Sequence, residues 1–391
     1  MDHHESEKRN LKNGRGYFIT FFLLLLFPLY GGIIDLALPK LKGVSMGSAM
    51  VQPSVKSTMD GSFQTAVGTF FEEHLPGKNA LLRLRGQGIY SLLKTAPNKH
   101  VVRGQDGYLF EPAYLQLQTQ IAQPVSAQQT DALSKQLQDL QQTLAQNGKE
   151  LYVFLTPSKA RFFPDKMPRS YTLAGSETPI ASSYENFLAS TKDTGLHVFD
   201  GISYLQENAG ALAAPLFYKS GTHWSRVWAD KAAIAFEEYI AATGNYDLAT
   251  LTLAEEKSDV CTHPDADIYM TCNLALPPQE QYYDSVITAK PGTQQPSVLM
   301  RGGSFMFSLW TLAEQNVFGN VDYLENMTYR TLEKDSERDI STMASYDEMD
   351  LTACVERADI VILEVNEASI GNMSFGLLEY LENNASMPLR K

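Results

Sequence analysis

Residues 296–305 have the sequence Pro-Ser-Val-Leu-Met-Arg-Gly-Gly-Ser-Phe, and a helix-forming stretch follows at 306–314. The apolar run predicts a buried strand, and the two glycines permit a tight turn from strand to helix. A turn of this kind exposes a serine hydroxyl where α/β enzymes place a nucleophile, with helix N–H groups available to a developing oxyanion. Ser304 is therefore a candidate nucleophile. The alternative is that Ser304 only caps the helix, which serine commonly does.

Other apolar runs, at 150–155 and 359–365 with a weaker one at 196–199, also predict strands. A polar stretch at 127–147 has leucines spaced by three and four, which predicts an amphipathic helix. This alternation is typical of an α/β fold with a parallel sheet and flanking helices. Ligands of such sheets bind at the carboxyl ends of the strands, so we expect the polar residues there to converge. These residues are Lys159, Asp200, Arg301, Asn366 and Glu367.

The composition of the 391-residue chain, 44% hydrophobic and 20% charged, is that of a globular protein. The formal net charge is -13, and beyond the first 15 residues the basic residues form no cluster. Because phosphate binding needs such a cluster, the sequence argues against a nucleic-acid partner. No cofactor is expected.

The N-terminus combines four basic residues between positions 8 and 15 with an apolar run from Tyr17 to Leu38. This pattern predicts a cytoplasmic tail (1–16), a single transmembrane anchor (17–38), a linker (39–61) and an extracytoplasmic domain (62–391). The chain would then be a single-pass membrane protein with its large domain outside the cytoplasm. A cleaved signal peptide is the alternative, although the run is long and no clear cleavage site follows it.

Cys261 and Cys272 lie eleven positions apart in a segment rich in turn-forming residues. Outside the cytoplasm, this spacing favours a local disulfide. A metal site that includes His263 and Asp265 is the alternative, but the spacing matches no recurrent zinc pattern.

His223 lies in the sequence Gly-Thr-His-Trp-Ser, just before a helix-forming stretch at 229–242. An imidazole near a helix start is suited to act as a general base for a serine hydroxyl. The alternative is a histidine whose hydrogen bonds only support the local structure.

The Thr-His-Trp-Ser block, preceded by Leu216-Phe-Tyr, resembles the alginate O-acetyltransferase AlgX/AlgJ family, which is SGNH hydrolase-like. Three other blocks, at 70–78, 104–110 and 156–168, resemble family segments in the same order. The resemblance covers most of the exported domain. It implies a three-layer SGNH hydrolase-like fold, in which Ser304 forms an acetyl ester that is passed to a hydroxyl of an exported polysaccharide. It also implies that a multipass membrane O-acyltransferase supplies the acetyl group.

The chain departs from the family pattern at Gly221 and Gly303, where the family usually has aspartate. Another carboxylate must then orient His223, unless the site is a dyad or is inactive. Asp200 is the first candidate, followed by Glu364 and Glu367. Asn366 resembles the oxyanion-binding asparagine of SGNH hydrolases, and Gly303, Arg301 and Lys159 are further candidates for oxyanion or glycan contacts. Two alternatives to acetyl transfer stay open: an acetylesterase with the same residues, and a silent glycan-binding subunit.

Overall fold

The computed structural model describes residues 16–23, 25–43, 52–326, 328–332, 341–343, 350–372 and 377. The chain divides into two compact units: a smaller one of residues 1–101 and 269–278, and a larger one of residues 102–268 and 279–391. Residues 62–101 of the predicted extracytoplasmic domain lie in the smaller unit, and the domain boundaries at 38, 61 and 62 stay predictions.

The smaller unit is built from helices. Residues 16–23 are helical, and α2 (Phe27–Ala37), α3 (Val55–Met59), α4 (Ser62–Glu73) and α5 (Lys78–Leu92) follow. The Asp35 carboxylate accepts the backbone N–H groups of Asn79 and Ala80, which the first turn of α5 leaves without helical partners.

The predicted anchor at 17–38 stays a prediction. Over the described part of the chain, no helix has both the length and the apolarity needed to span a bilayer. Residues 1–15 of the predicted tail, Leu24 of the predicted anchor and residues 44–51 of the predicted linker lie outside the described residues.

The larger unit contains a seven-stranded sheet with the strand order β10-β9-β8-β7-β11-β3-β4. The strands from β8 to β4 are mutually parallel, whereas β9 and β10 pair antiparallel at one edge. Two residues separate β8 from β9, too few for a parallel crossover. The four strands predicted from the sequence are confirmed, but the sheet is mixed. The strands are β3 (Glu150–Thr156), β4 (His197–Asp200), β7 (Val298–Gly302), β8 (Val321–Glu325), β9 (Thr328–Leu332), β10 (Ser341–Met343) and β11 (Ile360–Asn366).

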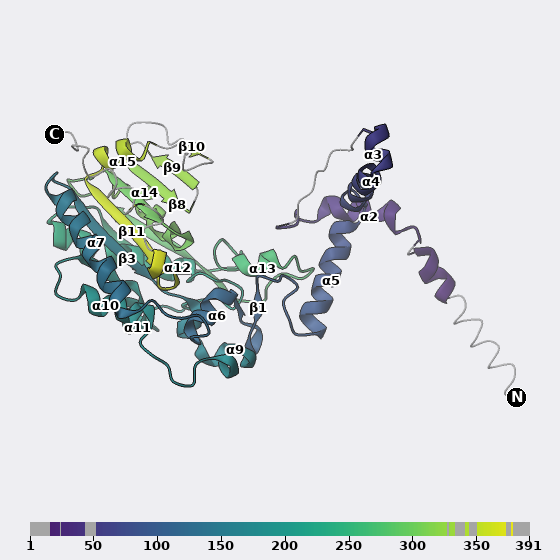
Figure 1. Cartoon of the computed structure of the whole chain (residues 1–391), viewed down its shortest axis with the longest axis horizontal. Coiled ribbons are helices and arrows are strands. Elements are labelled where there is room, and N and C mark those ends of the chain that lie inside the picture. The colour runs from purple at the N-terminus through teal and green to yellow at the C-terminus, as the bar shows by residue number, and fades with distance from the viewer. Residues whose placement is uncertain are drawn as a thin grey trace, which may run out of the picture. The chain divides into compact units, whose positions relative to one another are not determined.

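Helices cover both faces of this sheet (Figure 1), so the unit has three layers. Along β3, Tyr152 and Phe154 face α12 and α14, while Leu151, Val153 and Leu155 face α7 and α10. This alternation follows from the two-residue period of a strand, and a strand buried on both faces reads as continuously apolar. The covering helices are α7 (Ala127–Ala145), α10 (Ser183–Thr191), α12 (Arg226–Gly244), α14 (Phe307–Glu314) and α15 (Leu351–Arg357).

Further elements outside the seven-stranded sheet complete the larger unit. They are β1 (Val102–Arg103), β2 (Leu109–Phe110), α6 (Pro112–Gln118), α8 (Lys159–Phe162), α9 (Arg169–Ala174), α11 (Gly201–Asn208), β5 (Thr250–Ser258), α13 (Asp267–Thr271, shared between the units) and β6 (Tyr282–Lys290).

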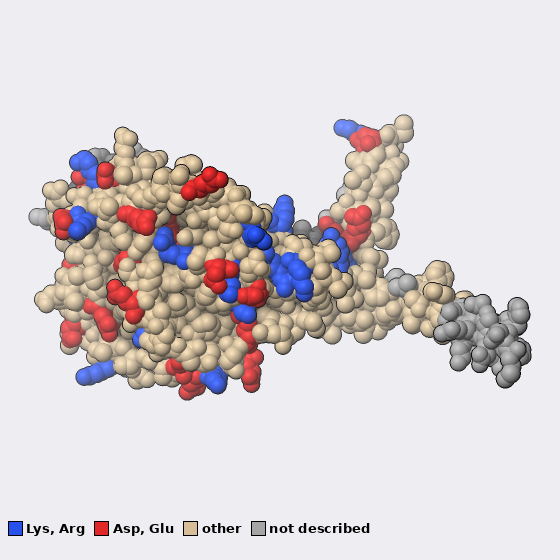
Figure 2. Space-filling view, turned by 90° about the horizontal axis from the view of Figure 1, so that it is seen from below, with Lys and Arg blue, Asp and Glu red and all other residues tan. Residues whose placement is uncertain are grey.

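Acidic and basic side chains are interspersed over the face seen in Figure 2, which gives a polyanion no continuous basic track on that face.

Phe154 lies on β3, the strand next to the edge strand β4, and its ring tests the packing of this core. Its ring, fully buried, stacks against Phe236 at 4.7 Å between centroids and contacts Trp224 and Phe199. Phe154→Ala should lower the free energy of unfolding by about 3–5 kcal/mol because it leaves a cavity among aromatic rings. Urea unfolding followed by tryptophan fluorescence measures this loss. Leu173→Ala, at a 76% exposed position, is the control and should cost far less; equal losses would contradict the packing.

Candidate active site

Ser304 stands at the carboxyl end of β7, where the chain turns into a short 3-10 helix (Ser304–Met306) and then α14. The turn needs a glycine at position 302 because β11 lies very close. A Cβ on Gly302 would lie 2.6 Å from the Cβ of Glu364, a separation that packed side chains do not reach. The Gly303 N–H donates to Glu364 Oε2 at 2.7 Å. Glu364 therefore fixes the backbone that presents the serine hydroxyl.

His223 meets this hydroxyl from the loop that precedes α12. Its Nε2 lies 2.8 Å from Ser304 Oγ, and its ring packs against Phe305 with 4.4 Å between centroids. The side chain is largely buried. This is the distance at which an imidazole takes a proton from a serine hydroxyl.

The carboxylate on the other side of the imidazole belongs to Asp267. Asp267 Oδ2 lies 2.6 Å from His223 Nδ1, and Oδ1 accepts the N–H groups of Thr222 and Ile268. Burial raises the pKa of Asp267, but the hydrogen bond and charge of His223, with the two backbone N–H groups, outweigh it and lower the pKa. Asp267 is thus held as a carboxylate, and the site contains a complete serine–histidine–aspartate arrangement.

The segment that carries Asp267 is docked on the histidine loop by three contacts. Asp265 Oδ1 accepts the N–H of Arg226 in the first turn of α12, and the Ser220 hydroxyl donates to the Asp265 carbonyl. A Cβ on Gly221 would lie only 2.8 Å from that same carbonyl oxygen. Because Gly221 has no side chain, the backbone that precedes Asp267 can pass directly against it.

The structure places Asp200 elsewhere. Its carboxylate caps α11 by accepting the N–H groups of Ile202 and Ser203, and it also accepts the Tyr184 hydroxyl at 2.7 Å. The reserve candidates are engaged too, since Glu364 binds Thr156 and Gly303, and Glu367 pairs with Arg161. The prediction that Asp200 orients His223 is therefore wrong: the carboxylate at His223 Nδ1 is that of Asp267. The oxygens of Asp200 accept hydrogen bonds from the first turn of α11 and from Tyr184.

The predicted oxyanion and glycan contacts also have structural partners. The Asn366 amide donates to the Pro157 carbonyl at 2.9 Å, and Arg301 donates to the carbonyls of Asn326 and Leu324. The Gly303 N–H is bound by Glu364. These donors hold strand ends and loops together, so the geometry does not support a direct substrate contact for them.

Lys159 is buried and organises the histidine loop. Its Nζ donates to the carbonyl oxygens of Leu109, Lys219 and Gly221 at 2.7–2.8 Å. Burial lowers the pKa of Lys159 to about 7, whereas three carbonyl acceptors require the three N–H groups of the ammonium form. Lys159 therefore joins β2 to the loop around Gly221 and leaves no donor for a glycan.

The expected disulfide is not present between Cys261 and Cys272. Cys261 is half-buried and Cys272 is buried, and both are reduced thiols. Within the described ranges, no group of three His, Cys, Asp or Glu side chains is arranged to hold a metal ion.

A serine, a histidine and an aspartate that meet at the carboxyl edge of an α/β sheet define a site of the acyl-transfer class. Residues 101–304 match the family model of the SGNH hydrolase-like domain of the acetyltransferase AlgX. This match covers more than half of the chain, and the chain belongs to that family. The resemblance seen in the sequence is thereby confirmed.

Two relatives share 25% identity with the chain. It is 25% identical over 272 residues to the probable alginate O-acetylase AlgJ of Pseudomonas aeruginosa, which covers 68% of this chain and 63% of that protein. The AlgJ of Azotobacter vinelandii is also 25% identical, over 288 residues, or 71% of this chain and 68% of that protein. The O-acetyltransferase domain of Pseudomonas putida AlgJ aligns with a TM-score of 0.44 and 16% identity, over 73% of this chain and 99% of that domain. The chain thus spans less than two thirds of the P. aeruginosa relative.

Glu364 makes the stability of the larger unit depend on pH. Burial raises the pKa of Glu364 to about 7, against the partly compensating hydrogen bonds of Thr156 and Gly303. The native state then binds this proton more tightly than the unfolded state, so the contribution of Glu364 to stability is fully present below about pH 4.5 and is lost as the pH rises through about 7. Glu364→Gln retains an acceptor for the Gly303 N–H but has no titrating proton. The change in the free energy of unfolding with pH should therefore become smaller by on the order of 3 kcal/mol.

Urea unfolding between pH 5 and 8, read by tryptophan fluorescence, measures this effect, because all three tryptophans lie in the larger unit. Asp265, whose pKa burial also raises to about 7, contributes equally in both proteins. The exposed Glu207→Gln is the control. An unchanged pH dependence in Glu364→Gln would show that Glu364 is not the titrating group.

Proposed function

We propose that this chain acetylates hydroxyl groups of an exported bacterial polysaccharide through an acetyl ester on Ser304. The observation that carries the proposal is the contact of His223 Nε2 with Ser304 Oγ at 2.8 Å, with Asp267 at 2.6 Å on the other ring nitrogen. The names of the AlgJ relatives support a polysaccharide as the acceptor.

The geometry supports a two-step transfer. Ser304 Oγ attacks the acetyl carbonyl while His223 takes the hydroxyl proton, and the donor group leaves with that proton. A sugar hydroxyl then attacks the ester, gives its proton to His223 and releases Ser304 in its original form. In both steps Asp267 stabilises the imidazolium and fixes the tautomer in which Nδ1 carries the proton.

The setting of the reaction is part of the same proposal. An apolar run at 17–38 with a basic N-terminal flank supports an inner-membrane anchor, with the catalytic unit in the periplasm or outside the cell. Acetyl groups made in the cytoplasm would then have to cross the membrane, which is why we propose a multipass O-acyltransferase as the donor partner.

Acetylation of Ser304 is the direct test. The folded protein, incubated with p-nitrophenyl acetate and quenched in acid, should yield a peptide with an acetyl group on Ser304 in mass spectrometry. Ser304→Ala should lose this adduct, and Ser308→Ala, on the helix that follows, should retain it. A folded protein without acetyl-Ser304 in the presence of donor would overturn the proposal.

Asp267 and Asp200 should differ sharply in their effect on turnover. Asp267→Asn removes the charge that stabilises the imidazolium and should reduce kcat for acetyl-ester turnover by about 10⁴-fold. Asp200→Asn disturbs the cap of α11 and the hydrogen bond from the Tyr184 hydroxyl, neither of which involves His223. It should reduce kcat for a small acetyl ester less than about tenfold while lowering thermal stability, since a cap is worth roughly 1 kcal/mol. Steady-state kinetics and thermal unfolding of both variants decide this; the reverse order would return Asp200 to the role of the acid.

A further inference from the structure

A pocket of about 220 Å³ opens beside the catalytic edge of the sheet. Its floor is formed by Glu367, which follows the last residue of β11, and by Arg161 of α8, which follows β3. Since β11 pairs with β7, the strand that ends at Ser304, the pocket and the serine lie at the same edge of the sheet. α6, α10 and the loop around Pro179 form the walls.

The floor of the pocket is a rigid ion pair. Arg161 binds Glu367 Oε2 through Nε and Nη2, both at 2.6 Å, and Glu367 Oε1 accepts the Ser158 N–H. The guanidinium also stacks on the Tyr184 ring at 4.7 Å, and the Tyr184 hydroxyl is held by Asp200. Asp200 thereby supports the wall of this pocket. The ion pair is fixed before any ligand arrives, which reduces the entropy cost of binding.

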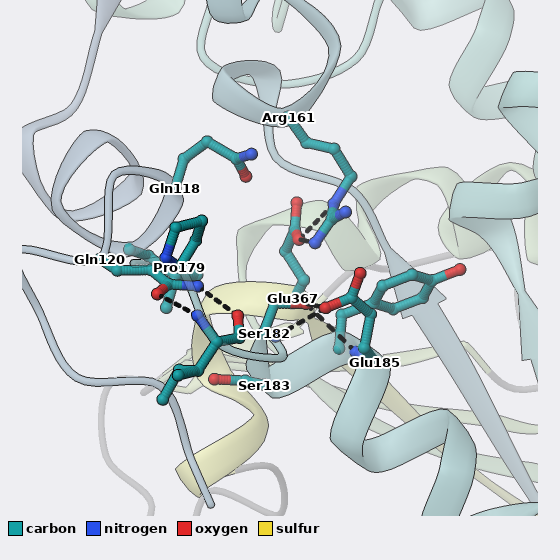
Figure 3. A pocket seen from close by; sticks show the side chains of 11 residues that line it. Gln118, Gln120, Arg161, Pro179, Ser182, Ser183, Glu185 and Glu367 are labelled. Carbon is teal, nitrogen blue, oxygen red and sulfur yellow. Dashed lines mark hydrogen bonds and ion pairs between the residues drawn. The ribbon is translucent and has the colours of Figure 1, made fainter. Parts of the chain in front are cut away.

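The pocket presents uncommitted hydrogen-bonding groups to a ligand. Figure 3 shows the Gln118 amide pointing toward the Arg161–Glu367 pair. Among the residues that the structure describes, no hydrogen-bond partner is recorded for that amide, although the side chain is half-buried. Gln120 bonds Ile180 in both directions and so fixes the rim. An amide beside a guanidinium can both donate to and accept from vicinal hydroxyls, which is the pattern that sugars require.

The charge of the lining selects against an anionic ligand. Among the described residues that line the pocket, the single cation is Arg161, which Glu367 already neutralises, and Glu185 adds a further negative charge at the rim. A ligand carboxylate would therefore meet no available positive charge. The volume is also below the roughly 300–1,000 Å³ of typical small-molecule sites, which suits one sugar ring.

We infer that this Gln118 pocket binds a neutral sugar residue of the acceptor polysaccharide, in preference to a uronic acid. This inference rests on the proposed function and adds the class of acceptor. It separates this chain from relatives named for alginate, a polyuronate. The sugar hydroxyls would bond Gln118 and the outer edge of Arg161, while the chain of the polymer leads away from the pocket.

Binding of matched tetrasaccharides tests the inference. The probes are β-1,4-mannotetraose and β-1,4-tetramannuronate, which differ only in the C6 carboxylate, with cellotetraose as a second neutral probe. Calorimetric titration of the full-length protein, without acetyl donor, should give at least tenfold tighter binding for a neutral probe than for tetramannuronate. Gln118→Trp, which fills the pocket, should weaken neutral binding at least tenfold, and Gln118→Ala should weaken it less.

Gln116→Trp places the same side chain at an exposed position of the same helix and should leave binding unchanged. Circular dichroism of each variant confirms folding. Equal or tighter binding of tetramannuronate, absence of binding by both neutral probes, or unaltered binding in folded Gln118→Trp would each overturn the inference. None of these outcomes affects acetylation of Ser304 by p-nitrophenyl acetate, so failure of the pocket and failure of the proposed function are distinguishable.

Discussion

The hydrogen bond between His223 Nδ1 and Asp267 Oδ2 is the interaction on which the site depends. It joins two segments that are 44 residues apart in the chain. To form this bond, the backbone of residues 264–265 must pass directly against Gly221. A Cβ at position 221 would lie only 2.8 Å from the carbonyl oxygen of Asp265. A histidine without this partner could still contact Ser304, but its tautomer and its charged form would lack support. The segment that places Asp267 beside His223 therefore occupies the space that a side chain at position 221 would need.

Buried polar groups hold the two catalytic loops in place from below. Glu364 binds the N–H of Gly303 under the nucleophile turn, and Lys159 gathers three carbonyls, including that of Gly221, under the histidine loop. Glu364 lies near the carboxyl end of β11, and Lys159 follows the carboxyl end of the neighbouring parallel strand β3. Because an unsatisfied buried charge is costly, such groups fix the backbone strongly only when all their bonds are made. Glu364 and Lys159 therefore position the loops that carry the Ser304 hydroxyl and the His223 imidazole.

The sequence was sufficient for the strands, the serine and the histidine, and insufficient for the acid. Apolar runs and leucine spacing are local signals, so β3, β4, β7 and β11 and the helix at 127–147 were predictable. Asp267 carries no such signal, because its role depends on a loop packing across the fold. The usable hint was Gly221 itself, which required an acid from elsewhere, together with the two aspartates, Asp265 and Asp267, that follow Pro264. Asn366, Arg301 and Lys159 were correctly placed at strand ends, but only the folded chain shows that carbonyl groups occupy their donors.

Proton NMR of the imidazole measures the central claim most directly. In ¹⁵N-histidine-labelled protein, a buried imidazole N–H that donates to a carboxylate gives a strongly low-field proton resonance. We predict one such resonance, assigned to His223 Nδ1, that is present in the unchanged protein and in Asp200→Asn and is lost or shifted upfield in Asp267→Asn. A resonance that persists in Asp267→Asn but disappears in Asp200→Asn would contradict the account.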